Sequence, residues 1–195
     1  MKPAFDQVAG DTIAKFLTME IGRIDPAIEQ ALRRILAGQS RYESVANKLP
    51  NPPWFVIAIL HQLESDGDFG THLHNGDPLS ARTVNEPAGR PRVGEPPFTW
   101  EESAWDAIRY DRLDQWSDWS IPGIAYQLEG FNGWGYRAHH VASPYLWAGC
   151  QHYSRGKFTS DGHFDYNAVS QQVGGMVLLR ELCRRGHVAL RASRA

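Results

Sequence analysis

A long run of mostly apolar residues that ends in a single carboxylate constrains this chain more than any other feature. The run, WFVIAILHQL, extends from Trp54 to Leu63, and Glu64 follows directly. Its length suits a buried helix, and Asn51-Pro52-Pro53 before it is a signal for a helix start. We therefore expect a helix over residues 53–64 that is buried along its length and carries Glu64 on its last turn.

The composition changes directly after Glu64. Residues 65–97 are rich in Gly, Asp, Asn, Pro and Arg. Asn75-Gly76 is a strong two-residue turn signal, and short strands are expected on either side of it, over 72–74 and 79–84. A long proline-rich loop completes the segment. The pattern predicts one small β-hairpin inserted after the buried helix.

Apolar spacing and capping signals predict the other helices. Thr99 and Glu102 form a capping box, and Asp25 and Asn167 are expected N-caps. Helices are expected over residues 4–19, 25–37, 99–113, 120–131 and 167–182, and a short helix or turn over 143–149. The sum is a mainly α (α+β) fold. We expect a single domain over residues 1–195, with 1–25 as an N-terminal helical extension and 186–195 as a basic tail.

Bulk properties exclude several classes of protein. A chain of 195 residues is long enough for one domain with its own core. A net charge of −2 gives no general attraction to nucleic acid. The longest purely apolar run, Trp54 to Leu60, is too short to span a bilayer, so no integral membrane segment is expected. Cys150 and Cys183 are too few for a disulfide framework.

The pairing of Glu64 with a downstream polar segment indicates glycosidic-bond chemistry. An acid beside an apolar wall keeps its proton, whereas an acid in a wet turn stays ionised. Asp77 lies just past the expected hairpin turn, and Thr83 follows six residues later. An aspartate beside a hydroxyl suits the positioning of an attacking water. Turn formation by Asp77 and strand propensity of Thr83 are the structural alternatives.

These residues resemble the lysozyme superfamily, in which a glutamate at a helix end precedes a small β-sheet. The spacing from Asp77 to Thr83 matches phage-type lysozymes, although the interval from Glu64 is longer, which implies an enlarged hairpin or a shifted alignment. Glu64-Ser65 and Phe131-Asn132-Gly133 are similar to motifs of goose-type lysozymes and lytic transglycosylases. The segments HLHNGDPLSART, PFTWEESAWDAIRYD, LEGFNGWGYR, SPYLWAG and HYSRGKF together resemble a bacterial and phage family of peptidoglycan hydrolases.

The resemblance implies a lysozyme-like domain that cleaves the β-1,4 bond between N-acetylmuramic acid and N-acetylglucosamine, with Glu64 as general acid. No metal or organic cofactor is required. The expected partner is the peptidoglycan glycan strand, and the protein is expected to be a monomer. The expected substrate-binding residues are His72, His74, Arg82, Glu129, Asn132, Trp134, Tyr136 and Tyr145.

The N-terminal sequence MKPAFDQVAGDTIAKF contains no apolar segment typical of a secretory signal. We therefore expect synthesis in the cytoplasm without a signal peptide. Action on the cell wall then requires release by a holin or a secretion system.

Several alternatives stay open at the level of sequence. Glu129 competes with Asp77 as the second carboxylate, and a lytic transglycosylase needs none because the C6 hydroxyl of the sugar attacks. Other readings are a chitinase- or chitosanase-like enzyme and a wall-binding module without activity. His72 and His74 with Asp77 could bind a metal, and Cys150 with His152 could form a nucleophile pair, but neither has a supporting signature.

Overall fold

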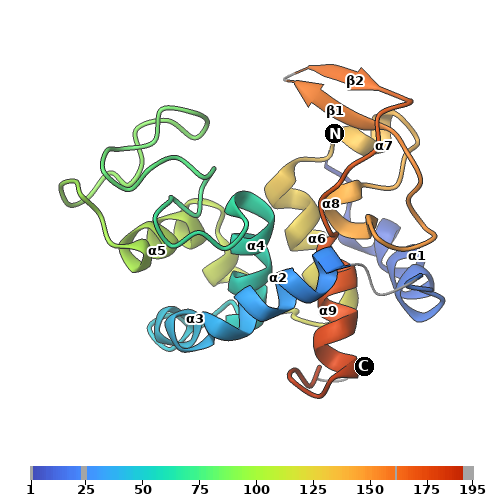
Figure 1. Cartoon of the computed structure of the whole chain (residues 1–195), viewed down its shortest axis with the longest axis horizontal. Helices are drawn as coiled ribbons and strands as arrows, with labels where there is room; N and C mark the ends of the chain where they lie inside the picture. The colour runs from blue at the N-terminus through green and yellow to red at the C-terminus, as the bar shows by residue number, and fades with distance from the viewer. Residues whose placement is uncertain (1, 23–25, 161, 191–195) are drawn as a thin grey trace. The chain divides into compact units, whose positions relative to one another are not determined.

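The computed structural model describes residues 2–22, 26–160 and 162–190 (Figure 1). The chain is mainly helical, with one small two-stranded antiparallel sheet, as the sequence predicts. Its internal contacts group into two compact units. The first unit combines Met1–Leu32 with Asp118–Ala195, and the second unit is Arg33–Ser117. The single domain and the lysozyme-like fold stay predictions.

Helix α4 (Trp54–Ser65) forms the core of the second unit. Every residue from 55 to 63 is buried. Helix α3 (Gln39–Ala46) packs against α4, and His61 of α4 contacts the rings of Phe69 and of Trp100, the first residue of α5 (Trp100–Tyr110). The short 3-10 helix η1 (Leu113–Gln115) follows α5. The buried helix that the apolar run predicts is confirmed.

Helix α5 begins as its capping residues predict. The amide of Glu102 donates to the hydroxyl of Thr99 over 3.3 Å, and the Glu102 carboxylate accepts the Thr99 amide over 2.7 Å. These reciprocal bonds satisfy two amides that an uncapped helix would leave without partners. The cap fixes where the irregular segment ends and the helix starts.

The first unit packs its helices around α6 (Ile121–Asn132), which contacts α1 (Phe5–Leu17), α8 (Pro144–Trp147) and α9 (Gly175–Arg184). The shorter elements are α7 (Gly135–Ala138), β1 (Lys157–Ser160) and β2 (His163–Asp165). Helix α2 (Pro26–Ala37) has residues in both units. No helix within the described ranges is long and apolar enough to cross a bilayer.

The position of the β-hairpin is a correction. Residues 66–98, all described, contain no strand, and only an isolated bridge joins Thr71 to Pro78. Pro78 has no amide hydrogen for a ladder, and the carboxylate of Asp77 binds the amides of Val84 and Asn85, which a strand would need. The observed strands β1 and β2 pair instead with Phe158 opposite Phe164.

Other differences from the predicted helices concern α9 and α3. Helix α9 begins at Gly175 rather than after Asn167, because the amide of Gly174 binds the carbonyl of Ala148 and ties the preceding chain to α8. Helix α3 was not expected after Gly38. The expected N-cap Asp25 and the tail residues 191–195 lie outside the described residues.

Two helical glycines give opposite expectations for stability. A Cβ at Gly10 in α1 would meet no atom within 4 Å, whereas one at Gly123 in α6 would overlap the carbonyl oxygen of Asp118. Gly10→Ala should raise the free energy of unfolding by about 0.5–1 kcal/mol, because alanine favours helix. Gly123→Ala should lower it by about 1–3 kcal/mol through overpacking. Urea denaturation of both variants measures this, and equal effects would contradict the packing of α6.

Candidate active site

Glu64 occupies the last turn of α4, as the sequence predicts, and its side chain is half-buried. The helix ends at Asp66, which adopts a left-handed conformation with φ of 54°. The turn at Asn75-Gly76 lies against this end of the helix, since a Cβ on Gly76 would be 3.1 Å from the carbonyl oxygen of Glu64. The structure therefore brings Glu64 and the polar segment together within the second unit.

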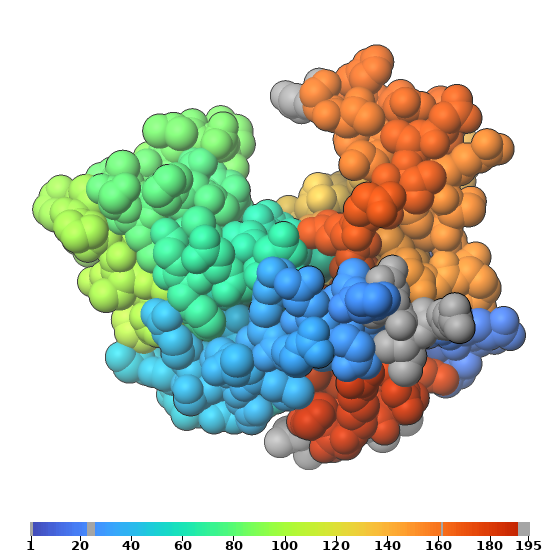
Figure 2. Space-filling model, in the orientation of Figure 1, coloured from blue at the N-terminus to red at the C-terminus, as the bar shows by residue number. Residues whose placement is uncertain are grey.

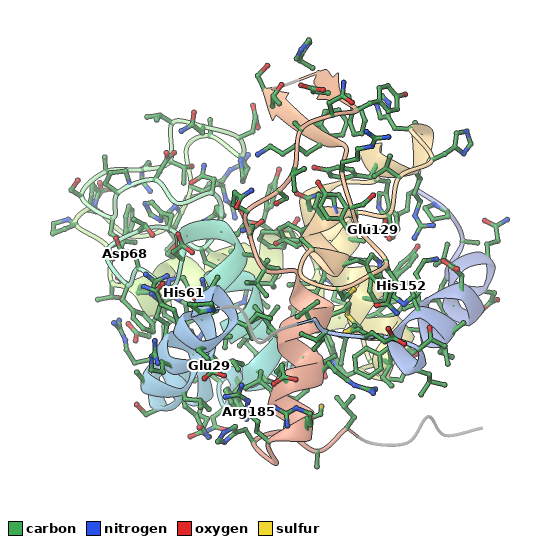
Figure 3. The ribbon with its side chains drawn as sticks, turned by 45° about the vertical axis from the view of Figure 1, so that its right-hand side comes forward. Glu29, His61, Asp68, Glu129, His152 and Arg185 are labelled. Carbon is green, nitrogen blue, oxygen red and sulfur yellow. The ribbon has the colours of Figure 1, made fainter. Side chains whose placement is uncertain are left out.

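A buried histidine one turn before Glu64 ties the end of α4 to the segment that follows. The Nδ1 atom of His61 lies 2.9 Å from the hydroxyl of Tyr42, and its Nε2 lies 3.0 Å from the carbonyl oxygen of Asp68 (Figure 3). A carbonyl only accepts, so Nε2 carries the proton and Nδ1 accepts from the tyrosine. The rings of Phe69 and Trp100 enclose the imidazole.

Burial lowers the pKa of His61 to about 4, although its hydrogen bond to the carbonyl of Asp68 acts in the opposite direction. The imidazole is therefore neutral at neutral pH and serves as a fixed donor and acceptor. Sequence reasoning missed this residue. The available signal was a histidine in the middle of an otherwise apolar helix.

Asp77 is buried and acts as an acceptor that shapes the loop. Its carboxylate accepts from the amides of Val84 (2.8 Å) and Asn85 (2.9 Å) and from the Asn85 side chain (2.7 Å). Desolvation acts to raise the pKa of Asp77, but these hydrogen bonds outweigh it and hold the pKa below its ordinary value. The group is an anion whose oxygens already have donors.

Thr83 is equally engaged. Its hydroxyl donates to the carbonyl of Pro87 and accepts from the amide of Arg90 over 2.9 Å. The backbone of Thr83 also bonds to Arg90 and to Gly89. The side chain thus closes the turn of residues 83–90, and its hydroxyl has both a donor and an acceptor partner inside that turn.

His72 and His74 are buried against α5. Nδ1 of His72 lies 2.8 Å from the hydroxyl of Ser103, and its Nε2 lies 2.8 Å from the carbonyl of Ala81. Burial lowers the pKa of His72, so it stays neutral. Nε2 of His74 lies 2.9 Å from the carboxylate of Asp106. Both imidazoles link the loop to α5 and have little exposed surface.

The arginines of the loop bind the loop itself. Arg82 donates to the carbonyls of Pro91 and Gly94 and lies 3.3 Å from Glu95. Arg90 forms two hydrogen bonds with Asp106, of 2.7 and 2.8 Å. The space-filling view shows this segment, in green, as a closely packed mass (Figure 2). Side chains thus replace the regular ladder that a hairpin would have supplied.

The remaining predicted residues belong to the first unit, where α6 ends at Asn132. Glu129 (Figure 3) is buried, and its carboxylate is paired with Arg137. Burial raises the pKa of Glu129, and Arg137 opposes this shift. Asn132 is exposed, and the half-buried ring of Trp134 lies 4.8 Å from that of Tyr126.

Two further predicted residues of the first unit are buried. The hydroxyl of Tyr136 lies 3.4 Å from the amide of Phe158, and the Tyr136 ring packs edge-on against Phe158 and Phe164. Tyr145 is 5% exposed. A buried tyrosine ring has no face for a sugar, so in the observed conformation these two side chains contribute packing rather than a stacking surface.

Two alternative chemistries find no support in the described residues. The thiol of Cys150 donates to the carbonyl of Trp147, and Nε2 of His152 lies 2.9 Å from the carbonyl of Lys15. Burial raises the pKa of Cys150, which disfavours the thiolate that a nucleophile needs. Within the described ranges no three His, Cys, Asp or Glu side chains are grouped to hold a metal ion.

Comparison with models of protein families, with curated proteins and with solved structures found no match to this chain. The resemblance to lysozymes therefore stays a prediction from the residues.

The hydrogen bonds of Asp77 predict a specific pH dependence. In Asp77→Asn, the side-chain amide would face amide donors, so the free energy of unfolding at pH 7 should fall by about 1–3 kcal/mol. Because folding lowers the pKa of Asp77, its contribution is complete above the unfolded value of about 3.9 and is lost as the pH falls through the folded value. The difference between variant and wild type should therefore shrink below about pH 4. Urea denaturation at pH 7 and pH 3 measures it, and a constant difference would refute an ionised Asp77.

Proposed function

We propose that this chain is a glycosidase that cleaves the β-1,4 bond between N-acetylmuramic acid and N-acetylglucosamine in peptidoglycan, with Glu64 as the general acid. The observation that carries the proposal is the setting of Glu64. It is the half-buried carboxyl at the end of a helix whose preceding nine residues are buried, and the polar segment lies against it.

The setting suits an acid for two physical reasons. The carbonyl end of a helix disfavours negative charge, which is the setting that a proton-donating carboxyl needs. The packing of α4 and the link from His61 to Asp68 hold the backbone on both sides of Glu64, so the proton donor is positioned before substrate binds. Glu64 then protonates the leaving O4 oxygen as the bond to C1 breaks.

Hydrolysis needs a second group to activate water, and Asp77 with Thr83 is the pair that the sequence proposes for this step. Glu129 is the rival, but its carboxylate is buried and paired with Arg137. For a water-activating role, Asp77 would have to bind water in addition to the donors that it already accepts. Arg82, His72 and His74 then act indirectly, by holding the loop that carries Asp77.

One observation favours a second candidate, a lytic transglycosylase at the same site. Asp77 and Thr83 both have their hydrogen-bonding capacity committed to the loop. In this reaction the C6 hydroxyl of the sugar attacks C1 and the C1–O4 bond breaks. Glu64 gives its proton to O4 and then takes the proton of the C6 hydroxyl. The products are a 1,6-anhydro sugar and a free O4 hydroxyl, and one carboxyl suffices.

The role of Glu64 is tested by its isosteric substitution. Glu64→Gln should lower the turnover of purified sacculi at least ~1,000-fold, because it removes the transferable proton. Its melting temperature should stay close to that of the wild type. Glu86→Gln, which changes an exposed acid of the same unit, is the matched control and should keep full activity. Unchanged turnover in Glu64→Gln would refute the proposal. Equal, negligible lysis by the wild type and by Glu64→Gln would favour a wall-binding module.

The mass of the released muropeptides separates the two reactions. Transglycosylation yields an anhydro product that is one water lighter than the product of hydrolysis. For the proposed glycosidase we expect the heavier product of hydrolysis, and the anhydro product would establish the second candidate, the lytic transglycosylase. Mass spectrometry of digested sacculi measures this, and incorporation of labelled oxygen from water into the reducing end would establish hydrolysis. Release from soluble chitin oligomers alone would point to a chitinase-like enzyme.

A further inference from the structure

The first unit contains an open pocket of about 430 Å³ that the proposed reaction does not use. This volume falls within the range of ~300–1,000 Å³ that is typical of small-molecule sites. The segment after α1 supplies one wall through Glu20 and Gly22. The second wall consists of Gly149, Cys150, Gln151, Tyr153 and Ser154. Val169 and Ser170 supply the third. All these residues lie in the same compact unit.

The first two walls are joined by the side chain of Gln151. Its amide nitrogen donates to the carbonyl of Thr18 over 2.6 Å, and its amide oxygen accepts from the backbone amide of Glu20 over 2.8 Å. An antiparallel bridge between Ile21 and Cys150 continues the contact. These bonds hold the Glu20 backbone in place beside the pocket.

The third wall is held by the hydroxyl of Tyr153. It donates to the carbonyl of Gly156 and accepts from the amide of Ser170 over 3.0 Å. A further bond joins the amide of Gly156 to the carbonyl of Ala168. The pocket is therefore built from three chain segments that side-chain hydrogen bonds fix to one another.

The lining has a defined chemical character. Glu20 contributes a carboxylate, and none of the described lining residues carries a positive charge. The Glu20 side chain is exposed and forms no ion pair with any described residue. Val169, 47% exposed, supplies an apolar surface to the pocket. A cation on a short apolar chain matches both the carboxylate of Glu20 and the apolar surface of Val169.

We propose that this pocket binds the ammonium group of a short aliphatic amine, such as the side chain of a diamino acid in a peptide. The assignment rests on the proposed function in one respect, because the stem peptides of peptidoglycan are the source of such an amine. Glu20 accepts a charge-assisted hydrogen bond from the ammonium group, and the methylene chain lies along the exposed side chain of Val169.

The test uses Nα-acetyl-lysine N-methylamide as the probe, because it combines an ammonium group and a short aliphatic chain with uncharged ends. Titration followed by NMR should shift the amide signals of Cys150 and Gln151. The Nε-acetylated probe, which lacks the charge, is the matched ligand control and should bind at least ~10-fold more weakly.

Two variants locate the site on the protein. Glu20→Gln should weaken binding of the charged probe at least ~10-fold, and Glu86→Gln should leave it unchanged. Val169→Trp places a large ring at the third wall and should abolish binding without loss of the fold, which the melting temperature checks. Equal binding of both probes, or binding that survives in Glu20→Gln, would overturn the assignment, as would the absence of any shift at millimolar probe.

The experiment separates this inference from the proposed function, because the probe contains no glycan. Binding of the probe without cleavage of sacculi would refute the glycosidase proposal and leave the pocket assigned as an amine site. Cleavage of sacculi without binding of the probe would refute only the assignment of the pocket as an amine site.

Discussion

The second unit depends on one buried hydrogen-bonded chain, from the hydroxyl of Tyr42 through the imidazole of His61 to the carbonyl of Asp68. A neutral imidazole in an aromatic enclosure is costly to bury unless both ring nitrogens have partners, and here both do. These two hydrogen bonds connect three elements: α3, α4 and the segment after α4. They therefore set where the polypeptide leaves the buried helix, and so where the backbone around Glu64 is held.

The segment between α4 and α5 is ordered by side chains rather than by backbone ladders. Asp77, Thr83 and Arg82 each bind several main-chain groups of the loop. His72 and His74 anchor the loop to α5 through Ser103 and Asp106. The residue types that suggest catalysis in a sequence are the same types that stabilise irregular backbone. Because Asp77, Thr83 and Arg82 are bonded to the loop in this way, the proposed chemistry rests more on Glu64 than on a second protein group.

Local signals predicted the elements that local interactions determine. Thr99 and Glu102 interact across one turn, so the start of α5 is readable from the sequence, and the apolar run makes α4 equally clear. The hairpin at Asn75-Gly76 was predicted wrongly because the carboxylate of Asp77 accepts hydrogen bonds from the amides of Val84 and Asn85. These bonds form only when the loop is folded, so the local sequence does not indicate them. The start of α9 depends on the contact of Gly174 with Ala148. Tertiary contacts of this kind leave no periodic trace in the sequence.

Cys150 and Cys183 are free thiols in a setting that limits their reactivity. Burial raises the pKa of both Cys150 and Cys183, so both thiols are almost wholly protonated at neutral pH. Thiol–disulfide exchange and oxidation proceed through the thiolate, so both reactions are slowed. While the protein is folded, exchange with external thiols and mild oxidation should therefore be slower at both positions than at an exposed cysteine.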